Sequence, residues 1–329
     1  MQRFIQKHLY KRSVLSYLLF PFSLVYMFVG YLKRRLFVGN KVGSIPIIGV
    51  GSIVSGGTGK TPLTLFLAKY LSKKGKKTAI ITRGYKGSLG SKSVVVDKNS
   101  PLQLVGDEAK MLFVKLPEVP IVVGRNRAKS IQIINSKFPK TDFIIADDVF
   151  QNGKIKRAFD IVVFSSNGGV GNGFVLPAGI LRESLTACKY ADLIVIVGKD
   201  KKLQKRLCRF NKNIVYGDIR VVGFFDLAGK RVEVQALKSK QIALVSAIGN
   251  PKSFEQTITS LGLKFEEHFA LDDHSTSYKR ALQRIKKMKA DFIITTEKDF
   301  VKMDKPPRNL LVCRVKLQMD EDILNEFRI

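Results

Sequence analysis

The sequence predicts an α/β protein whose larger part is a doubly wound sheet that carries a phosphate-binding loop. From residue 44 onward, short apolar runs alternate with stretches of helical periodicity, which is the pattern of such sheets. Several runs, among them "DLIVIVGK", are apolar throughout, as expected for strands covered on both faces. The stretch "GSIVSGGTGKTPLTLF" at 51–66 lies between a predicted strand and a predicted helix, and it ends as a P-loop does.

The first 42 residues differ from the rest and are predicted to form a membrane-anchoring helix. Ser13 to Leu32 is a run of 20 residues without a charge, with Lys11 and Arg12 before it and Lys33 after it. That length is enough to cross a bilayer core, while cations on both flanks also suit a helix lying in one leaflet. A helix buried within the fold is the remaining interpretation, and the choice between spanning and lying stays open.

The elements after this segment divide the chain into two lobes. A strand is predicted in 45–52 and a helix in 61–75, and further strand-like runs such as "TAIITRG" and "FDIVVFSS" follow. The predicted units are a nucleotide-binding domain at 43–219, a β-hairpin linker at 220–236 and a smaller C-terminal α/β lobe at 237–329. The last helical segment, 321–328, is free to pack back on the first domain.

The charge of the chain is strongly basic. Lys and Arg number 57 against 27 Asp and Glu, a formal net charge of +30. Such a surface attracts polyanions, either nucleic acid or an anionic membrane, although lysine-rich solvated faces alone would give the same count. The three cysteines are scattered, which argues against a disulfide framework and against a zinc site.

The loop at 55–61 has the residue types that phosphate binding needs. Its glycines allow backbone N–H groups to turn toward phosphate oxygens, and the following helix adds its positive end. Lys60 would reach the β- and γ-phosphates, and the Thr61 hydroxyl would bind Mg²⁺. Val54 stands where the usual motif has its first glycine. The predicted ATP-binding residues here are Ser55, Gly56, Gly57, Thr58, Gly59, Lys60 and Thr61.

Other polar residues follow predicted strands or open predicted helices. Asp147 and Asp148 end the apolar run "DFIIADD", where a cation would compensate for their burial. Asp107 precedes a helix, so it is either a helix-capping residue or the base that accepts a proton from an attacking hydroxyl. Arg182 follows a glycine-rich stretch, and it either neutralises phosphoryl charge or forms a surface ion pair. His274, beside an aspartate in a polar loop, is a candidate for acid–base work.

Taken together and in this order, the motifs resemble those of the tetraacyldisaccharide 4'-kinases, the lipid A 4'-kinases of Gram-negative bacteria. The resemblance covers nearly all of the chain, including the apolar segment, and the family's loop also lacks the first Walker glycine. The motifs that carry it are "SGGTGKTP" (55–62), "TRGYKG" (82–87), "GDE" (106–108), "DDVFQN" (147–152), "GNGFVLPAGILRE" (171–183), "AIGNP" (247–251), "DH" (273–274) and "TEKD" (296–299).

The resemblance implies a P-loop kinase-like fold and a reaction. ATP would phosphorylate the 4'-hydroxyl of a tetraacylated glucosamine disaccharide 1-phosphate at the cytoplasmic face of the inner membrane. Asp107 looks like the catalytic base, oriented by His274 from the second lobe. The remaining residues that the resemblance assigns to ATP, Mg²⁺ and the transition state are Glu108, Asp147 and Asp148 as metal ligands, Gln151 and Glu183 toward ATP, and Arg182 toward the transferred phosphoryl group. The expected partners are the lipid A precursor and the anionic membrane surface, and the protein is expected to be a monomer.

Departures from the family pattern are few. Val149 replaces a usual glycine, which puts the local backbone geometry in question, while Asn152 and Ser275 replace frequent histidines. The main competing function is a P-loop NTPase that binds nucleic acid through its basic surface. A nucleic-acid enzyme has no evident need for the apolar segment, and the chain lacks an aromatic-interleaved basic motif of the RNA-binding type. We therefore expect a lipid kinase that binds no nucleic acid.

Overall fold

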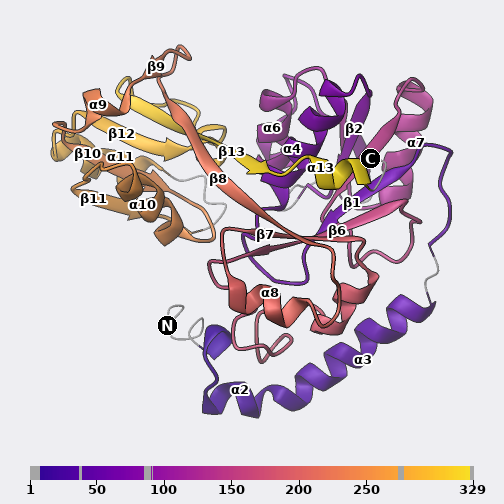
Figure 1. The fold of residues 1–329 in the computed structure, drawn as a ribbon. Helices are drawn as coiled ribbons and strands as arrows, with labels where there is room; N and C mark the ends of the chain where they lie inside the picture. The colour runs from indigo at the N-terminus through magenta and orange to yellow at the C-terminus, as the bar shows by residue number, and fades with distance from the viewer. Residues whose placement is uncertain (1–7, 37–38, 85–89, 91, 273–277, 327–329) are drawn as a thin grey trace.

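A computed structural model describes residues 8–36, 39–84, 90, 92–272 and 278–326. One β-sheet with both parallel and antiparallel strands runs through both lobes (Figure 1). The strand order is β11-β10-β12-β13-β8-β7-β6-β1-β5-β2-β4-β3, and β9 pairs with β8 outside this path. The strands are β1 (Ile47–Gly51), β2 (Thr78–Thr82), β3 (Ser93–Val95), β4 (Ile121–Gly124), β5 (Phe143–Asp147), β6 (Phe159–Ser165), β7 (Leu193–Val197), β8 (Ile214–Phe225), β9 (Arg231–Val232), β10 (Ile242–Ser246), β11 (Glu267–Ala270), β12 (Phe292–Thr296) and β13 (Leu310–Met319).

Helices cover both faces of this sheet, as the apolar runs predicted. β1 shows why, because Ile48 and Val50 face a core shared with α4, while Ile47 faces a second core shared with α7. The helices of the larger lobe are α4 (Lys60–Lys73), α5 (Leu102–Val105), α6 (Asp107–Lys115), α7 (Arg127–Lys137), the 3₁₀ helix η1 (Leu185–Tyr190) and α8 (Lys201–Leu207). Those of the smaller lobe are α9 (Val234–Leu237), α10 (Pro251–Ser260), α11 (Lys279–Lys287) and α12 (Glu297–Phe300), and α13 (Asp322–Glu326) ends the described chain.

The strands β8 and β13 run between the two lobes as a long antiparallel pair, with Val312 opposite Phe225 at one end and Met319 opposite Gly217 at the other (Figure 1). The predicted hairpin also forms, since β9 pairs with β8 at Phe225 and Arg231. It lies at the smaller-lobe end of β8. After β13 the chain returns to the larger lobe, where the Tyr70 hydroxyl of α4 donates to Asn325 Oδ1 of α13 at 2.6 Å.

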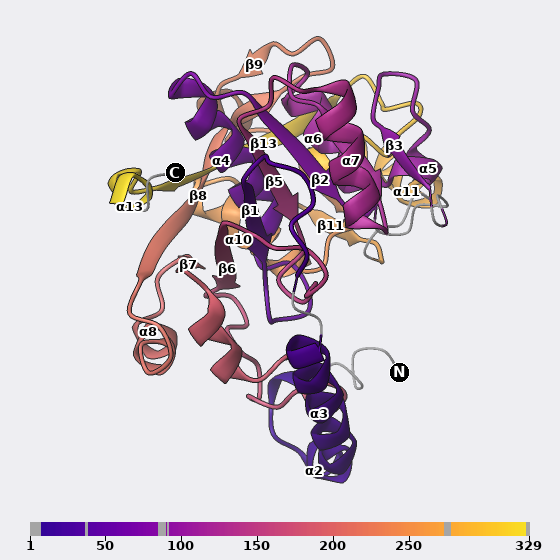
Figure 2. The same ribbon diagram turned by 90° about the vertical axis from the view of Figure 1, so that its right-hand side faces the viewer.

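The apolar N-terminal segment forms two helices, α2 (Val14–Leu18) and α3 (Phe20–Leu36), that lie along the base of the larger lobe (Figures 1 and 2). The Ser13 side chain caps α2 by accepting from the Ser16 backbone N–H. α3 has 17 residues. Within the described residues, no helix has both the length and the apolar character needed to cross a membrane.

α3 is attached to the larger lobe by polar groups on its inner side. Ser23 is 1% exposed, and its hydroxyl donates to the Val175 carbonyl at 2.8 Å and accepts from the Ala178 N–H at 3.1 Å. At the C-terminal end, Arg34 Nη2 lies 2.7 Å from Glu183 Oε2. The N-terminal segment therefore has one face on the protein, and its outer face carries exposed apolar side chains.

Candidate functional site

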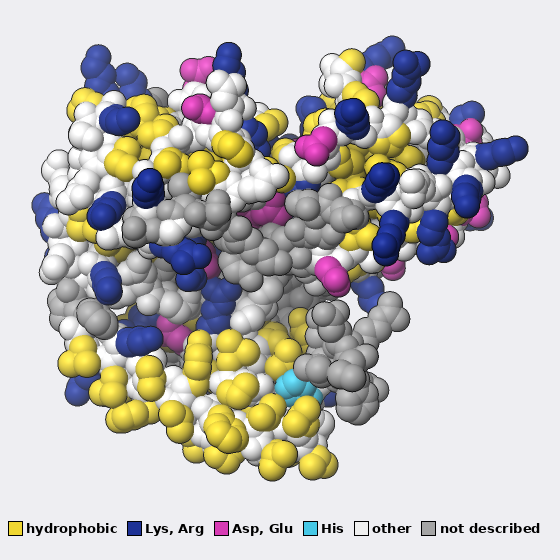
Figure 3. Space-filling model, turned by 180° about the vertical axis from the view of Figure 1, so that it is seen from behind, with side chains coloured by type: hydrophobic (Ala, Val, Ile, Leu, Met, Phe, Trp, Pro, Cys, Tyr) yellow, Lys and Arg dark blue, Asp and Glu magenta, His cyan; other side chains and the backbone are white. Residues whose placement is uncertain are grey.

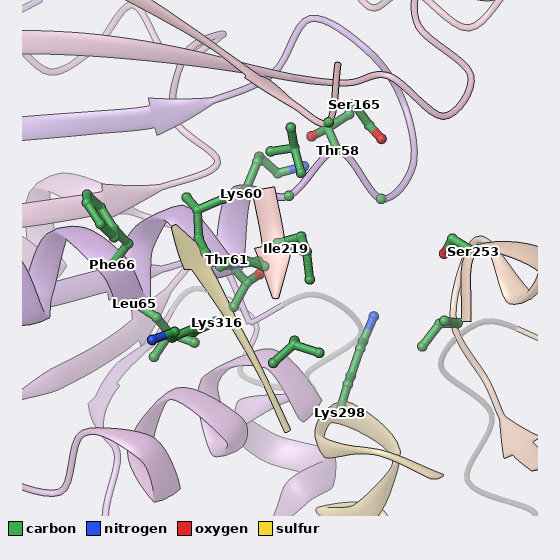
Figure 4. A pocket seen from close by; sticks show the side chains of 18 of the residues that line it. Thr58, Lys60, Thr61, Leu65, Phe66, Ser165, Ile219, Ser253, Lys298 and Lys316 are labelled. Carbon is green, nitrogen blue, oxygen red and sulfur yellow. The ribbon is translucent and has the colours of Figure 1, made fainter. Parts of the chain in front are cut away.

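The loop at 55–61 opens onto a cavity of about 1400 Å³ that both lobes line. Lys60 and Thr61 reach it from the start of α4, while Ser253 and Lys298 reach it from the smaller lobe (Figure 4). Arg182 and Asp148 also line it. The cavity lies beyond the carboxyl end of β1, where ligands of open α/β sheets bind.

The glycines of the loop leave room for a ligand. Gly56 and Gly59 have φ of 102° and 96°, a region that favours glycine. A Cβ added at Gly56 or Gly57 would meet no atom within 4 Å, so the loop there borders open space. At Gly59 a Cβ would come within 2.9 Å of the Val197 side chain, so this glycine is needed for packing. Thr58 is buried between these positions.

Val54 is part of the core. It is 4% exposed and forms an isolated antiparallel bridge with Leu181. On either side of this bridge, the Ser55 N–H donates to the Ile180 carbonyl at 2.9 Å, and the Arg182 N–H donates to the Ile53 carbonyl at 2.6 Å. The residue that departs from the usual motif thus anchors the segment that brings Arg182 to the cavity.

Asp148 forms ion pairs with Lys60 of the phosphate loop and with Arg182. Its Oδ1 lies 3.0 Å from Arg182 Nη1 and 3.7 Å from Lys60 Nζ. Burial by itself raises the pKa of this carboxyl, but the Lys60 and Arg182 charges outweigh burial and lower the pKa below its usual value. The positive φ of 52° falls on Asp148, and Val149 is accommodated in the core without a left-handed backbone. Position 149 therefore does not need the left-handed backbone that a glycine would allow.

Asp147 has a different environment from its neighbour. It is 1% exposed, and its Oδ1 accepts a long hydrogen bond of 3.5 Å from the Thr64 hydroxyl. Burial, and next the negative charge of Glu108, raise the pKa of Asp147 to about 7. Its carbonyl is held by the buried Arg127, whose Nη2 donates at 3.0 Å. A cation near this carboxylate would remove the cost of burying it, although the described residues hold no ready-made cluster of three or more metal ligands.

Asp107 and Glu108 open α6. Glu108 lines the cavity, whereas Asp107 is buried and is not among the lining residues. Gly106 precedes them with φ of 83°, and Asp107 Oδ1 accepts from the Glu108 N–H at 2.9 Å. Two lysines reach Asp107 from the smaller lobe, and one of them, Lys298, belongs to the "TEKD" motif. Lys298 Nζ and Lys302 Nζ each lie 3.8 Å from Asp107 Oδ2, and Lys298 is also 3.6 Å from Glu108 Oε1. Two of the three charges of "TEKD", at the end of a strand, therefore face the cavity between the lobes.

The remaining predicted residues lie elsewhere. Gln151 donates to the Ser52 carbonyl at 3.0 Å, and Glu183 pairs with Arg34 of α3. Neither is among the residues that line the large cavity. Burial raises the pKa of Glu183 against the opposing effect of Arg34. His274 lies outside the described residues, so its predicted pairing with Asp107 stays a prediction.

Known proteins are similar to this chain in sequence. A family model described as tetraacyldisaccharide-1-P 4'-kinase matches residues 15–328. The tetraacyldisaccharide 4'-kinase of Francisella philomiragia is 36% identical over 267 residues, which cover 80% of this chain and 83% of that protein. The enzyme of the same name from Mannheimia succiniciproducens is 30% identical over 309 residues, covering 90% and 88% of the two chains.

A solved structure agrees with these matches. The crystal structure of LpxK from Aquifex aeolicus in complex with ATP is similar to this chain with a TM-score of 0.76 and 25% identity, and it covers 96% of this chain and 98% of that one. The region matched by the family model, 15–328, includes the phosphate loop, the paired aspartates and both lobes. On this evidence, the chain belongs to the tetraacyldisaccharide-1-P 4'-kinase family.

Proposed function

We propose that this protein is a membrane-associated kinase that transfers the γ-phosphoryl group of ATP to the 4'-hydroxyl of a tetraacyldisaccharide 1-phosphate, a step of lipid A biosynthesis. The observation that carries the proposal is the cavity between the lobes. The phosphate loop with Lys60 lines it from the larger lobe, and Lys298 lines it from the smaller lobe. Asp107 is buried behind this lining, with its Oδ2 3.8 Å from Lys298 Nζ. Family membership supports the choice of nucleotide and acceptor.

The residues divide the work of transfer in the way that phosphoryl transfer requires. The loop N–H groups and Lys60 hold the β- and γ-phosphates, with their negative charge facing the start of α4. Arg182 stabilises the charge that develops on the transferred group. Asp107 accepts the proton of the attacking hydroxyl, and His274 orients it from the second lobe. Gln151 and Glu183 lie behind Arg182 and support its segment, Gln151 through the Ser52 carbonyl and Glu183 through its ion pair with Arg34 of α3.

The donor set near the loop suits Mg²⁺ bound together with the nucleotide. Mg²⁺ in such sites takes one or two carboxylates besides phosphate oxygens, so a complete protein cage is not needed. Thr61, Glu108, Asp147 and Asp148 are the residues that would hold it. The ion would neutralise phosphate charge during transfer.

The outer face of α2 and α3 supports docking on a membrane. Figure 3 shows hydrophobic side chains gathered over the base of the molecule where these helices lie. Val14, Phe22, Val25, Phe28 and Leu36 are each at least 61% exposed. An apolar helix face flanked by cations suits insertion into one anionic leaflet. We propose that the face defined by these residues places the enzyme on the cytoplasmic side of the inner membrane.

Replacing Phe22, Val25 and Phe28 by serine should weaken co-sedimentation with vesicles that contain anionic lipid. A matched control is Leu227→Ser, which removes an exposed leucine (40%) from the distant hairpin turn. If both proteins sediment like the wild type, the apolar face of α3 is not the membrane-binding surface.

The reaction itself is tested by incubating the full chain with radiolabelled ATP and the tetraacyldisaccharide 1-phosphate in mixed micelles. We expect label in the lipid. Single-stranded nucleic acid is added in a parallel reaction, because the basic surface suggested a nucleic-acid-dependent NTPase as the alternative. ATP hydrolysis stimulated by nucleic acid, with no label in the lipid, would support that alternative.

A further inference from the structure

The buried ammonium of Lys302 occupies an unusual position in the smaller lobe. Its side chain is 1% exposed and lies just after α12, at the boundary with the larger lobe. Burying a lysine is costly unless its charge is paired, and here Asp299 Oδ1 lies 2.7 Å from Lys302 Nζ. The Ala247 carbonyl accepts a further hydrogen bond from Nζ at 3.3 Å.

The partner of Lys302 is itself rigidly held. Asp299 is fully buried, and it accepts from the Tyr278 hydroxyl at 2.8 Å and from the Thr296 hydroxyl at 2.6 Å. The Lys302 ammonium also lies 5.7 Å from the centre of the Tyr278 ring. All these groups belong to the smaller lobe. They fix one ammonium in position within that lobe.

This fixed ammonium points across the boundary at Asp107. Lys302 Nζ lies 3.8 Å from Asp107 Oδ2, the oxygen opposite the one that accepts from the helix N–H. Lys298 also contacts Oδ2, but its side chain is 20% exposed, lines the cavity and divides its contacts between Asp107 and Glu108. Lys302 is thus the more constrained of the two lysines, and Asp299 already balances its charge.

We propose that Lys302 is a positioning residue for Asp107, through which the smaller lobe sets the orientation of the base in the larger lobe. The inference rests on the proposed role of Asp107 in phosphoryl transfer. A carboxylate that must accept a proton from a bound hydroxyl needs a defined rotamer, since small displacements of a reacting group cost large factors in rate. The contact between Lys302 and Asp107 exists only when the two lobes are together. The orientation of the base therefore depends on how the lobes are arranged.

The test compares Lys302→Met in two backgrounds, the wild type and Asp107→Asn, with kcat, the KM for ATP and ATP binding measured for each full-length protein. We expect Lys302→Met to lower kcat by about 10- to 100-fold with little change in the KM for ATP, a loss of the size that misplaced catalytic groups cause. In the Asp107→Asn background it should cause no further loss, because groups that act through one another are not additive. Equal losses in both backgrounds would overturn the inference.

Two further variants separate positioning from stability. Lys302→Met leaves the buried Asp299 without its cationic partner, so Lys302→Met combined with Asp299→Asn removes both charges together. If this double variant regains wild-type kcat, Lys302 only neutralises Asp299 and the inference fails, whereas a kcat as low as that of Lys302→Met supports it. Lys302→Arg, which keeps the charge, should recover part of the activity.

Lys115→Met is the matched control for contact between the lobes. Lys115 Nζ of α6 lies 2.7 Å from Glu297 Oε2 of α12. This ion pair joins the lobes close to the contact between Lys302 and Asp107, but through different residues. It should lower kcat less than Lys302→Met does. An equal loss would show that lobe contact in general, and not Lys302, sets the rate. Absence of transfer by the wild-type protein would contradict the proposed function itself, which keeps the two failures distinct.

Discussion

At the scale of single residues, neighbours in the sequence have different environments. Asp147 and Asp148 are adjacent, yet burial raises the pKa of the first to about 7 while Lys60 and Arg182 lower the pKa of the second. Carboxyls whose pKa values are shifted by burial and by specific charges are found preferentially at functional sites. Val54 shows the same dependence on context, since it is a packing residue here and not a defective phosphate ligand.

Lys60 is the residue on which nucleotide chemistry depends most directly. Lys60→Ala should abolish phosphoryl transfer, because the β- and γ-phosphates lose their cation and Asp148 loses one of its partners. The measurement is incorporation of label into the lipid. Lys76→Ala, which changes an exposed lysine beyond the end of α4, should behave like the wild type. Near-normal turnover of Lys60→Ala would remove the loop from the mechanism.

Asp107 tests the proposed base. Asp107→Asn keeps the side-chain shape but cannot accept the proton, so kcat should fall by roughly 10²- to 10⁴-fold, the usual contribution of general-base catalysis. ATP binding, followed by equilibrium dialysis, should change little. A change confined to KM would show that Asp107 binds substrate and does not act as a base.

At the scale of elements, α3 shows how one helix serves two environments. Its inner side is joined to the larger lobe by the buried Ser23 hydroxyl and by Arg34, which also lies 4.7 Å from the centre of the Phe150 ring. Its outer side carries exposed Phe and Val side chains. The helix is therefore a docked element, and the charges at its end connect it to Glu183, beside Arg182 of the site.

Ser23→Ala should loosen this docking. The change leaves the Val175 carbonyl and the Ala178 N–H buried without their partner, which costs about 1–3 kcal/mol. Because such elements open as local units, the measurement is hydrogen exchange of the amides at 14–36. Ser136→Ala removes an exposed hydroxyl from another helix and serves as the control. Unchanged exchange in Ser23→Ala would show that α3 is held by other contacts.

At the scale of the whole molecule, one sheet connects both walls of the cavity. β8 is parallel to β7 on one side and antiparallel to β13 on the other, and β13 is parallel to β12 of the smaller lobe. The division of the chain at 43–219, 220–236 and 237–329 stays a prediction. The pair β8–β13 is the structural link that a division by sequence order alone would miss.

A ligand that contacts both lobes should stabilise the whole protein. ATP with Mg²⁺ at about 100 times its Kd should add about 2.7 kcal/mol to the free energy of unfolding. A thermal shift experiment measures this as a rise in Tm, and Lys60→Ala should show a smaller rise at the same concentration. No shift for the wild-type protein would contradict nucleotide binding at this site.

The sequence by itself determined the α/β class, the phosphate loop, the paired aspartates at the end of β5 and the apolar segment, because each is encoded by local periodicity or by neighbouring residues. Family resemblance then indicated the reaction. Only the tertiary structure decided that Val54 bridges to Leu181, that Glu183 faces Arg34, and that Lys302 points at Asp107. These contacts join residues far apart in the chain, and the sequence contains no local pattern that pairs one buried charge with another. The packing of the lobes against each other and of α3 against the larger lobe brings the charged pairs together.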